Sequence, residues 1–332
     1  MYSLKESTRD SINSWQEEAR RVLRKNHMPP TRYGESFVIE SPIGDVRKLS
    51  VASKQSPVMG LDVWEELSDE DRKRIVLMDL KDPYLAWQAA NLEGVGARVI
   101  YLKEGEKKDI KLKGGGLYWI VLAKRSELRV EDQIMNTEQA IRRMFVWQHE
   151  DSEFSFMGWR AGNKFLNERL RVELLEDGAC SRVSHLTCGK EMEQSDIEVA
   201  VYHKASFTES DLVVRTVAAG KSVNMYRGMI WVDKGLMNIK GKENGKALMV
   251  SKKAVVDILP RLDVNSENVQ CEHGVGIMQL SDDKLIYLRS RGLSEKEARQ
   301  LMILGFFREN MGCSEMVDKS LENMVNRGFN KL

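Results

Sequence analysis

Cys271, Glu272 and His273 form the segment of this 332-residue chain with the clearest capacity for chemistry. A thiol, a carboxylate and an imidazole stand there in consecutive positions, and all three groups can bind transition metals. On a β-strand the side chains of Cys271 and His273 would share one face, whereas that of Glu272 would point away. The segment is therefore a candidate metal or sulfur site. The structural alternative is a buried thiol, a hydrogen-bonded imidazole and a solvated carboxylate.

Three further cysteines and one histidine form a second set of candidates. Cys180 and Cys188 lie among predicted strands, where sulfur transfer would require a reachable thiolate and where a small core residue is the alternative. His203 ends a predicted strand on its apolar face, as core histidines often do. Cys313 lies between two predicted helices and is expected to be inert. The cysteine spacing fits neither a zinc site nor a disulfide framework, which predicts free thiols in a reducing compartment.

The overall composition argues against several classes of function. The chain contains 51 Lys and Arg against 50 Asp and Glu, so no basic field favours nucleic acid. No apolar run reaches the length of a membrane span, and the first 24 residues alternate charges instead of forming a signal-peptide core. A cytoplasmic protein is expected. The chain has no G-x-x-x-x-G-K-[ST] segment, so it is not expected to bind a nucleotide as an ATPase does.

Short strands separated by turns dominate the middle of the chain. Alternating apolar residues mark the strands, as at Ile197, Val199 and Val201, and Asn244-Gly245 is typical of a turn between two of them. Such a series fits a β-sandwich, a barrel or a β-solenoid. Because no strict repeat period is evident, the spacing by itself favours a sandwich.

The chain is predicted to end in two amphipathic helices, at 294–309 and 314–327. Ser294 and Glu297 form a capping box, in which each side chain binds the backbone of the other residue. The apolar stripe of this helical hairpin must be buried against the protein body or a partner.

Three blocks together resemble the SufB/SufD family, the scaffold proteins of iron–sulfur cluster assembly. The resemblance extends from about residue 165 to residue 310, and the Cys-x-His-Gly block is more similar to SufD, so a SufD-like or minimal single-scaffold member is indicated. The blocks are His203–Ala205 with Thr208–Ser210, Arg215 and Tyr226–Ile230; Pro260–Leu262 with Val269, Cys271, His273 and Gly274; and Leu285–Gly292 with Glu297, Ala298, Gly305 and Phe306.

The resemblance implies a mainly β protein with a right-handed parallel β-helix core, in place of the sandwich. An N-terminal helical and mixed α/β part would cover residues 1–95, the β-helix residues 96–288, and a C-terminal helical segment residues 289–332. Helical parts at both ends could protect the open ends of a β-helix.

The resemblance also implies a non-catalytic scaffold that dimerises through its β-helix, with an identical chain or with a SufB-like scaffold. The ABC-type ATPase SufC would dock on the terminal helices and hydrolyse ATP, while this chain binds no nucleotide. A transient iron–sulfur cluster would use Cys271 and His273 as iron ligands, and two such pairs across a dimer axis would supply four ligands. Sulfur would come from a separate donor. Further cluster or sulfur-handling candidates are Glu272, Cys188, Cys180 and His203.

The docking surface for SufC is expected to be apolar and adaptable. Arg215, Arg289 and Arg291 are expected to be structural. Two alternatives stay open: a regulator of SufC that holds no iron, and a β-helix carbohydrate-active enzyme, for which no clear cluster of carboxylates is evident. The expected docking residues are Ala298, Leu301, Met302, Phe306, Phe307, Val317, Leu321 and Met324.

Overall fold

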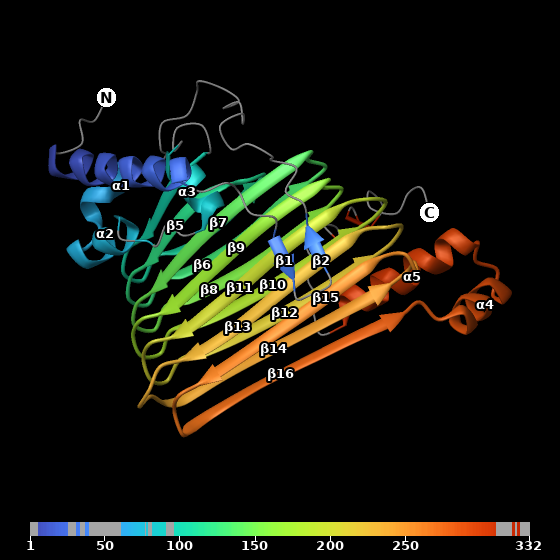
Figure 1. The fold of residues 1–332 in the computed structure, drawn as a ribbon. Helices are drawn as coiled ribbons and strands as arrows, with labels where there is room; N and C mark the ends of the chain where they lie inside the picture. The colour runs from blue at the N-terminus through green and yellow to red at the C-terminus, as the bar shows by residue number, and fades with distance from the viewer. Residues whose placement is uncertain are drawn as a thin grey trace.

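Two parallel β-sheets, wound from one continuous stretch of chain, form the body of the protein (Figure 1). The structure, a computed structural model, describes residues 6–25, 31–33, 37–39, 61–76, 78, 82–90, 96–309, 321–322 and 324–325. One sheet has the strand order β16-β14-β12-β10-β8-β6-β4, and the other β15-β13-β11-β9-β7-β5-β3. Successive strands alternate between the sheets, so the fold is a parallel β-helix.

Each residue of a strand pairs with a residue one coil further along the chain, where a coil is one full turn of the β-helix. Cys180 pairs with Glu209, 29 residues later, and Gly241 pairs with Cys271, 30 residues later. The first sheet contains β4 (Lys107–Lys113), β6 (Glu127–Met135), β8 (Glu153–Ala161), β10 (Cys180–Gly189), β12 (Glu209–Ala218), β14 (Met237–Met249) and β16 (Asn268–Gln279). The second contains β3 (Arg98–Leu102), β5 (Gly116–Leu122), β7 (Gln139–Gln148), β9 (Phe165–Leu174), β11 (Gln194–His203), β13 (Val223–Val232) and β15 (Val255–Val264). A separate antiparallel pair is formed by β1 (Thr31–Tyr33) and β2 (Phe37–Ile39).

The β-helix confirms the fold implied by the family resemblance, and the sandwich favoured by strand spacing is wrong. Both folds bury alternate residues of short strands, so the spacing could not separate them. The turn predicted at Asn244-Gly245 is also wrong, because both residues lie inside β14. Gly245 faces the opposite sheet, where an added Cβ would lie 2.9 Å from Ile258 Cγ2. This glycine therefore serves close packing and not chain reversal.

Four charged side chains form a buried cluster inside the β-helix, among the aliphatic side chains of its core. Asp132 accepts hydrogen bonds from Arg142 at 3.0 Å and from Arg160 at 2.7 Å, and Arg160 also pairs with Glu168 at 2.7 Å. Burial alone would raise the pKa of Glu168, but Arg160 holds that pKa at about 2. Two cations and two anions thus neutralise each other. Burial lowers the pKa of the neighbouring His185 to about 4, so this imidazole is neutral at physiological pH.

N-terminal helices cover the outer face of the sheet that begins with β3 (Figure 1). These helices are α1 (Glu6–Lys25), the 3-10 helix η2 (Leu61–Glu66), α2 (Asp69–Val76) and α3 (Pro83–Ala90). Trp15 of α1 packs edge-to-face on Trp119 of β5, with ring centroids 5.8 Å apart. Because large aromatic side chains bury much apolar area, this cover contributes a second core. Within the described residues, no helix combines the length and the apolar character needed to cross a membrane.

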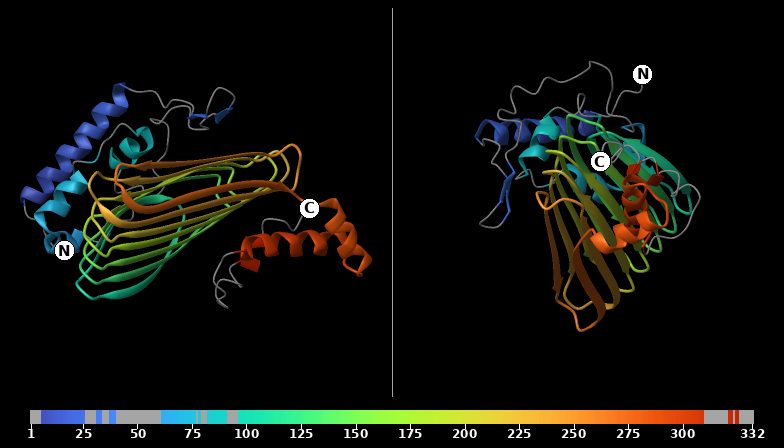
Figure 2. Two further views of the ribbon diagram at one scale, coloured as in Figure 1. Left: turned by 90° about the horizontal axis from the view of Figure 1, so that it is seen from below. Right: turned by 90° about the vertical axis from the view of Figure 1, so that its right-hand side faces the viewer.

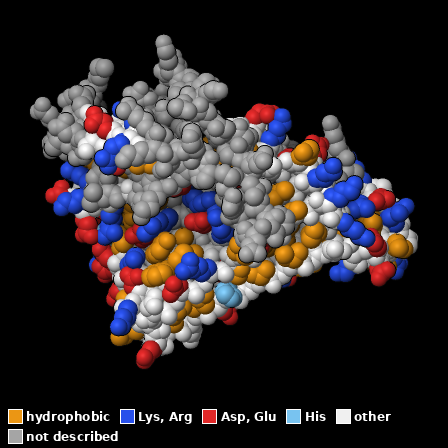
Figure 3. All heavy atoms as spheres, viewed as in Figure 1, with side chains coloured by type: hydrophobic (Ala, Val, Ile, Leu, Met, Phe, Trp, Pro, Cys, Tyr) orange, Lys and Arg blue, Asp and Glu red, His pale blue; other side chains and the backbone are white. Residues whose placement is uncertain are grey.

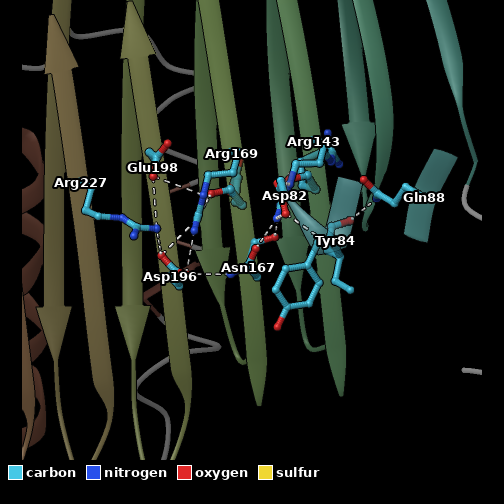
Figure 4. Close-up of polar contacts among 12 residues, drawn as sticks. Asp82, Tyr84, Gln88, Arg143, Asn167, Arg169, Asp196, Glu198 and Arg227 are labelled. Atoms are coloured by element: carbon cyan, nitrogen blue, oxygen red, sulfur yellow. Dashed lines mark hydrogen bonds and ion pairs between the residues drawn. The ribbon is translucent and has the colours of Figure 1, made fainter. Parts of the chain in front are cut away.

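A ladder of charged and polar side chains ties α3 to the outer face of this sheet (Figure 4). Asp82, just before α3, pairs with Arg143 of β7 at 2.5 Å, and Arg143 donates to Asn167 of β9 at 2.7 Å. Asn167 in turn donates to Asp196 of β11, which also accepts from Arg227 of β13 at 2.9 Å. The ladder joins four neighbouring strands, so it fixes the helix relative to the coils.

His149, directly after β7, connects α2 to the β-helix. Its Nε2 lies 3.3 Å from the Asp71 carboxylate and its Nδ1 lies 2.9 Å from Glu176 Oε1. The hydrogen bond with Asp71, supported by Glu176, raises the pKa of His149 to about 9 although burial opposes this rise. The imidazolium therefore stabilises the folded state at neutral pH.

We expect the stability of the protein to depend on pH through His149. A folded-state pKa above the unfolded value of 6.5 gives a contribution that is complete below pH 6.5 and is lost as the pH rises through about 9. The loss should be on the order of 1 kcal/mol, because solvent reaches part of the site. Urea unfolding from pH 6 to pH 10 checks this: the His149→Gln variant should lack this decline, and identical pH curves for the two proteins would contradict it.

The C-terminal helices lie on the side of the β-helix away from α1–α3 (Figure 2), and the second of them packs against the outer face of the other sheet. They are α4 (Asp282–Ser290) and α5 (Glu295–Arg308). The predicted capping box of Ser294 and Glu297 is present at the start of α5. The last strand ends at Gln279, so the helical part begins before residue 289. Most of the second predicted helix, 314–327, lies outside the described residues, although Leu321, Glu322, Met324 and Val325 are helical.

Candidate functional site

β16 is the last strand of its sheet, and it carries the Cys271–His273 segment. Within the described part of the chain it pairs only with β14, so its other edge is open (Figure 1). Cys271 pairs with Gly241 and His273 with Glu243, both on the inward side of β14. The expectation that Cys271 and His273 share one face is therefore consistent with the strand register. Glu272 points outward, is exposed and pairs with Lys242 at 2.9 Å.

The Cys271 thiol is half-buried at the end of the β-helix core. Its Sγ lies 3.2 Å from the position that a Cβ would occupy at Gly241, so the missing side chain there leaves room for the sulfur. Burial raises the pKa of Cys271, and a backbone hydrogen bond with Gly241 opposes this only in part. The group is thus a thiol at neutral pH and must lose its proton when it binds a metal or sulfur.

The coil around Cys271 is open to solvent. His273 is exposed, and the apolar side chains of Val275 and Ile277 on the same face of β16 are 45% and 50% exposed. In earlier coils the corresponding inward positions are covered by the next pair of strands. Inward side chains at the last coil would therefore meet whatever binds the end of the β-helix.

The structure does not bring the other sulfur-handling candidates to Cys271. Cys188 is buried on the outer face of β10, below the C-terminal helices, and burial raises its thiol pKa well above the usual range. Cys180 is half-buried at the start of the same strand. Two strands, β12 and β14, separate β10 from β16. Cys313 lies outside the described residues.

His203 is a core histidine with both ring nitrogens in use. Its Nδ1 lies 2.7 Å from Thr208 Oγ1 and its Nε2 lies 2.9 Å from Ser210 Oγ. The residue is completely buried, and burial lowers its pKa to about 4. Both ring nitrogens therefore have hydroxyl partners in this structure, so His203 has no nitrogen free for iron or sulfur.

Most residues predicted to contact SufC are buried within this chain. Phe306, Phe307, Leu321 and Met324 pack against the outer face of the β8–β14 strands, together with Cys188. The apolar stripe that predicts a docking surface for a partner is instead buried by the protein's own sheet. The remaining members of that set differ in exposure: Ala298 is buried, Met302 is half-buried, Leu301 is exposed, and Val317 lies outside the described residues.

Glu243 is a residue of this site that sequence reasoning missed. It is only 2% exposed, and neither of its carboxyl oxygens has a hydrogen-bond partner. Burial raises its pKa to about 7; the hydroxyl of Tyr226 is close enough to oppose this slightly but lies outside hydrogen-bond geometry. The only signal in the sequence was an acidic residue at an inward position of a strand.

The described residues of one chain do not form a complete metal centre by themselves. In the part of the protein that the structure describes, no three side chains of His, Cys, Asp or Glu are arranged to hold a metal ion. A thiol, an imidazole and a buried carboxyl nevertheless lie on the same face of two paired strands at an open end. This donor set suits iron once further ligands are supplied from outside the chain.

The fold and this open-ended site define a parallel β-helix protein that presents ligands at its last coil. Residues 97–306 match the domain described as "SUF system FeS cluster assembly, SufBD core domain". The match covers more than half of the chain, which therefore belongs to the SufBD family of the SUF iron–sulfur cluster assembly system. The β-helix occupies most of the matched region.

Several curated proteins are similar to this chain over about half of its length. The iron–sulfur cluster assembly protein SufD of Escherichia coli (strain K12) is 26% identical over 160 residues, which are 48% of this chain and 38% of SufD. A SufBD family protein of Staphylococcus epidermidis is 25% identical over 165 residues, 50% of this chain and 35% of that protein. A SufBD family protein of Mycobacterium leprae is 30% identical over 153 residues, 45% of this chain but 18% of that protein. The matching segments thus span well under half of each relative.

Proposed function

We propose that this protein is a scaffold on which an iron–sulfur cluster is assembled, with Cys271 and His273 as transient iron ligands. The observation that supports this most directly is the position of both residues on the inward face of the open edge strand β16, within a SufBD core domain. The cluster is cargo, built from iron and from sulfur supplied by a separate donor. The chain has no catalytic role in this proposal, and it acts in the cytoplasm.

The open end of the β-helix favours dimerisation. β15 and β16 are the last strands of their sheets, and unpaired strand edges readily accept another chain. Val275, Ile277 and Met278 of β16 add exposed apolar surface at this end, and Figure 3 shows hydrophobic side chains along the lower edge of the molecule, where the last strands lie. A second copy, or a SufB-like scaffold, would cover this surface and bring a second set of ligands to Cys271 and His273.

The C-terminal helices are the proposed docking site of a SufC-like ATPase. Ile286 and Tyr287 of α4 and Leu301 of α5 are 63%, 58% and 49% exposed, and they replace the buried residues as the proposed contacts. The end of α5 is tied to the strand beside β16, because Lys246 of β14 pairs with Glu309 at 2.6 Å. Movement of docked ATPases would therefore reach β14 and the site next to it.

The proposal is tested on the purified chain with SufC. Anaerobic incubation with ferrous iron and a sulfide source should give a brown, dimeric complex that contains both ATPase and stoichiometric iron and sulfide. The readouts are native mass, iron content and sulfide content. A complex that stimulates ATP hydrolysis but retains no iron would contradict the scaffold function and would select the regulator of SufC instead.

A further inference from the structure

Glu243 is a buried carboxyl group whose present surroundings do not satisfy it. The carboxyl crosses the last coil toward β13: an added Cβ at Gly228 would lie 1.5 Å from its Oε1. No described group meets hydrogen-bond geometry with either oxygen, and the buried hydroxyl of Tyr226, which lies close to the carboxyl, is likewise without a partner in that geometry. Burying a polar group without a partner costs about 1–3 kcal/mol, so an apolar side chain would suit the coil better.

The strand register places Glu243 beside the candidate ligand His273. Glu243 of β14 and His273 of β16 are paired residues of neighbouring parallel strands, on the inward face. Neighbouring strands lie about 4.8 Å apart, so the two side chains are within reach of each other through rotamer changes. Cys271 lies two residues earlier on the same face.

A histidine that binds a metal through one ring nitrogen usually donates the N–H of the other nitrogen to a carboxylate or carbonyl oxygen. The acceptor fixes the tautomer and the ring orientation, and it makes the imidazole a stronger ligand. Among the described residues, no side chain forms a hydrogen bond with His273. Glu243 has two unoccupied acceptor oxygens on the adjacent strand.

We propose that Glu243 is the positioning residue of His273: its carboxylate accepts the N–H of the His273 nitrogen that faces the interior, while the other nitrogen binds the metal. This inference rests on the proposed function, because it assumes that His273 binds a metal. It adds a role for a buried residue that is separate from the ligands themselves. Gly228 then has a role as well, since its missing side chain provides the space in which the carboxylate lies.

Substitution of Glu243 should separate stability from metal binding. In Glu243→Leu an apolar side chain replaces an unsatisfied carboxyl, so the melting temperature should stay the same or rise. The affinity for Co²⁺, used alone as a probe under anaerobic conditions, should fall by about 10–100-fold. A residue with a purely structural role would not give this opposite pair of effects.

Two matched variants control the experiment. Glu272→Leu makes the same substitution at the outward, exposed carboxylate of the neighbouring strand, and it should leave Co²⁺ affinity unchanged. Gly228→Ala keeps the carboxyl but displaces it, because the new methyl group would occupy its position. This variant should also weaken Co²⁺ binding, and Glu243→Gln, which keeps an acceptor oxygen, should weaken it less than Glu243→Leu.

The outcomes distinguish the two proposals. If the wild-type protein binds Co²⁺ and Glu243→Leu binds it equally well, the positioning role is wrong while the proposed site stands. If Glu243→Leu changes the ligand-field spectrum to that of a different ligand set, Glu243 is itself a ligand and the positioning role is again wrong. If the wild-type protein binds neither Co²⁺ nor iron, the proposed site fails and this inference fails with it.

Discussion

Asp132→Asn should destabilise the protein by about 3–5 kcal/mol, because it leaves buried arginines without their shared counter-charge. Asp132 is completely buried and pairs with both Arg142 and Arg160. Asparagine keeps the size and an acceptor oxygen but removes the charge. Among the described residues, Glu168 would then be the anion left to pair with the two buried guanidinium groups of this cluster. The free energy of unfolding in urea measures the effect.

Asp109→Asn is the matched control for this variant. Asp109 lies on β4, the strand next to β6, but its side chain is exposed, so its stability should change by less than about 0.5 kcal/mol. A loss below 1 kcal/mol in Asp132→Asn would contradict the prediction, and it would indicate that water or a nearby group already compensates the buried charges.

Cys271→Ser and His273→Ala should each reduce cluster-bound iron by roughly tenfold or more after anaerobic reconstitution with SufC. Serine replaces a soft thiolate by a hydroxyl group that binds iron poorly at neutral pH, and alanine removes the imidazole altogether. Both positions lie at the solvent-accessible end of the β-helix, so the fold should survive. Iron and sulfide analysis, together with the visible absorption spectrum, gives the measurement.

Cys180→Ser provides the control for loss of a thiol. Cys180 is also half-buried, but it lies on β10, three strands along the sheet from β16. This variant should retain the cluster, and circular dichroism should show all variants folded. If Cys271→Ser and His273→Ala both hold the cluster as the wild type does, the assignment of the site to β16 is wrong.

Local patterns in the sequence determined the local structure well. The capping box at Ser294 and Glu297 starts α5 as predicted, because it depends only on residues three positions apart. Side chains alternate between the two faces of a strand, so the sequence order alone puts Cys271 and His273 of β16 on one face and Glu272 on the other. Only the family resemblance indicated a β-helix, because strand spacing alone favours a sandwich.

Contacts between coils were decided only by the tertiary structure. The residues that meet are about 30 positions apart, and the chain has no strict repeat that would reveal this offset. The charged cluster around Asp132, the pairing of Glu243 with His273 and the burial of Cys188 below α5 all depend on it. The apolar stripe of α5 likewise predicted burial but not the burying surface, because hydrophobic association has no direction and the protein's own sheet was available.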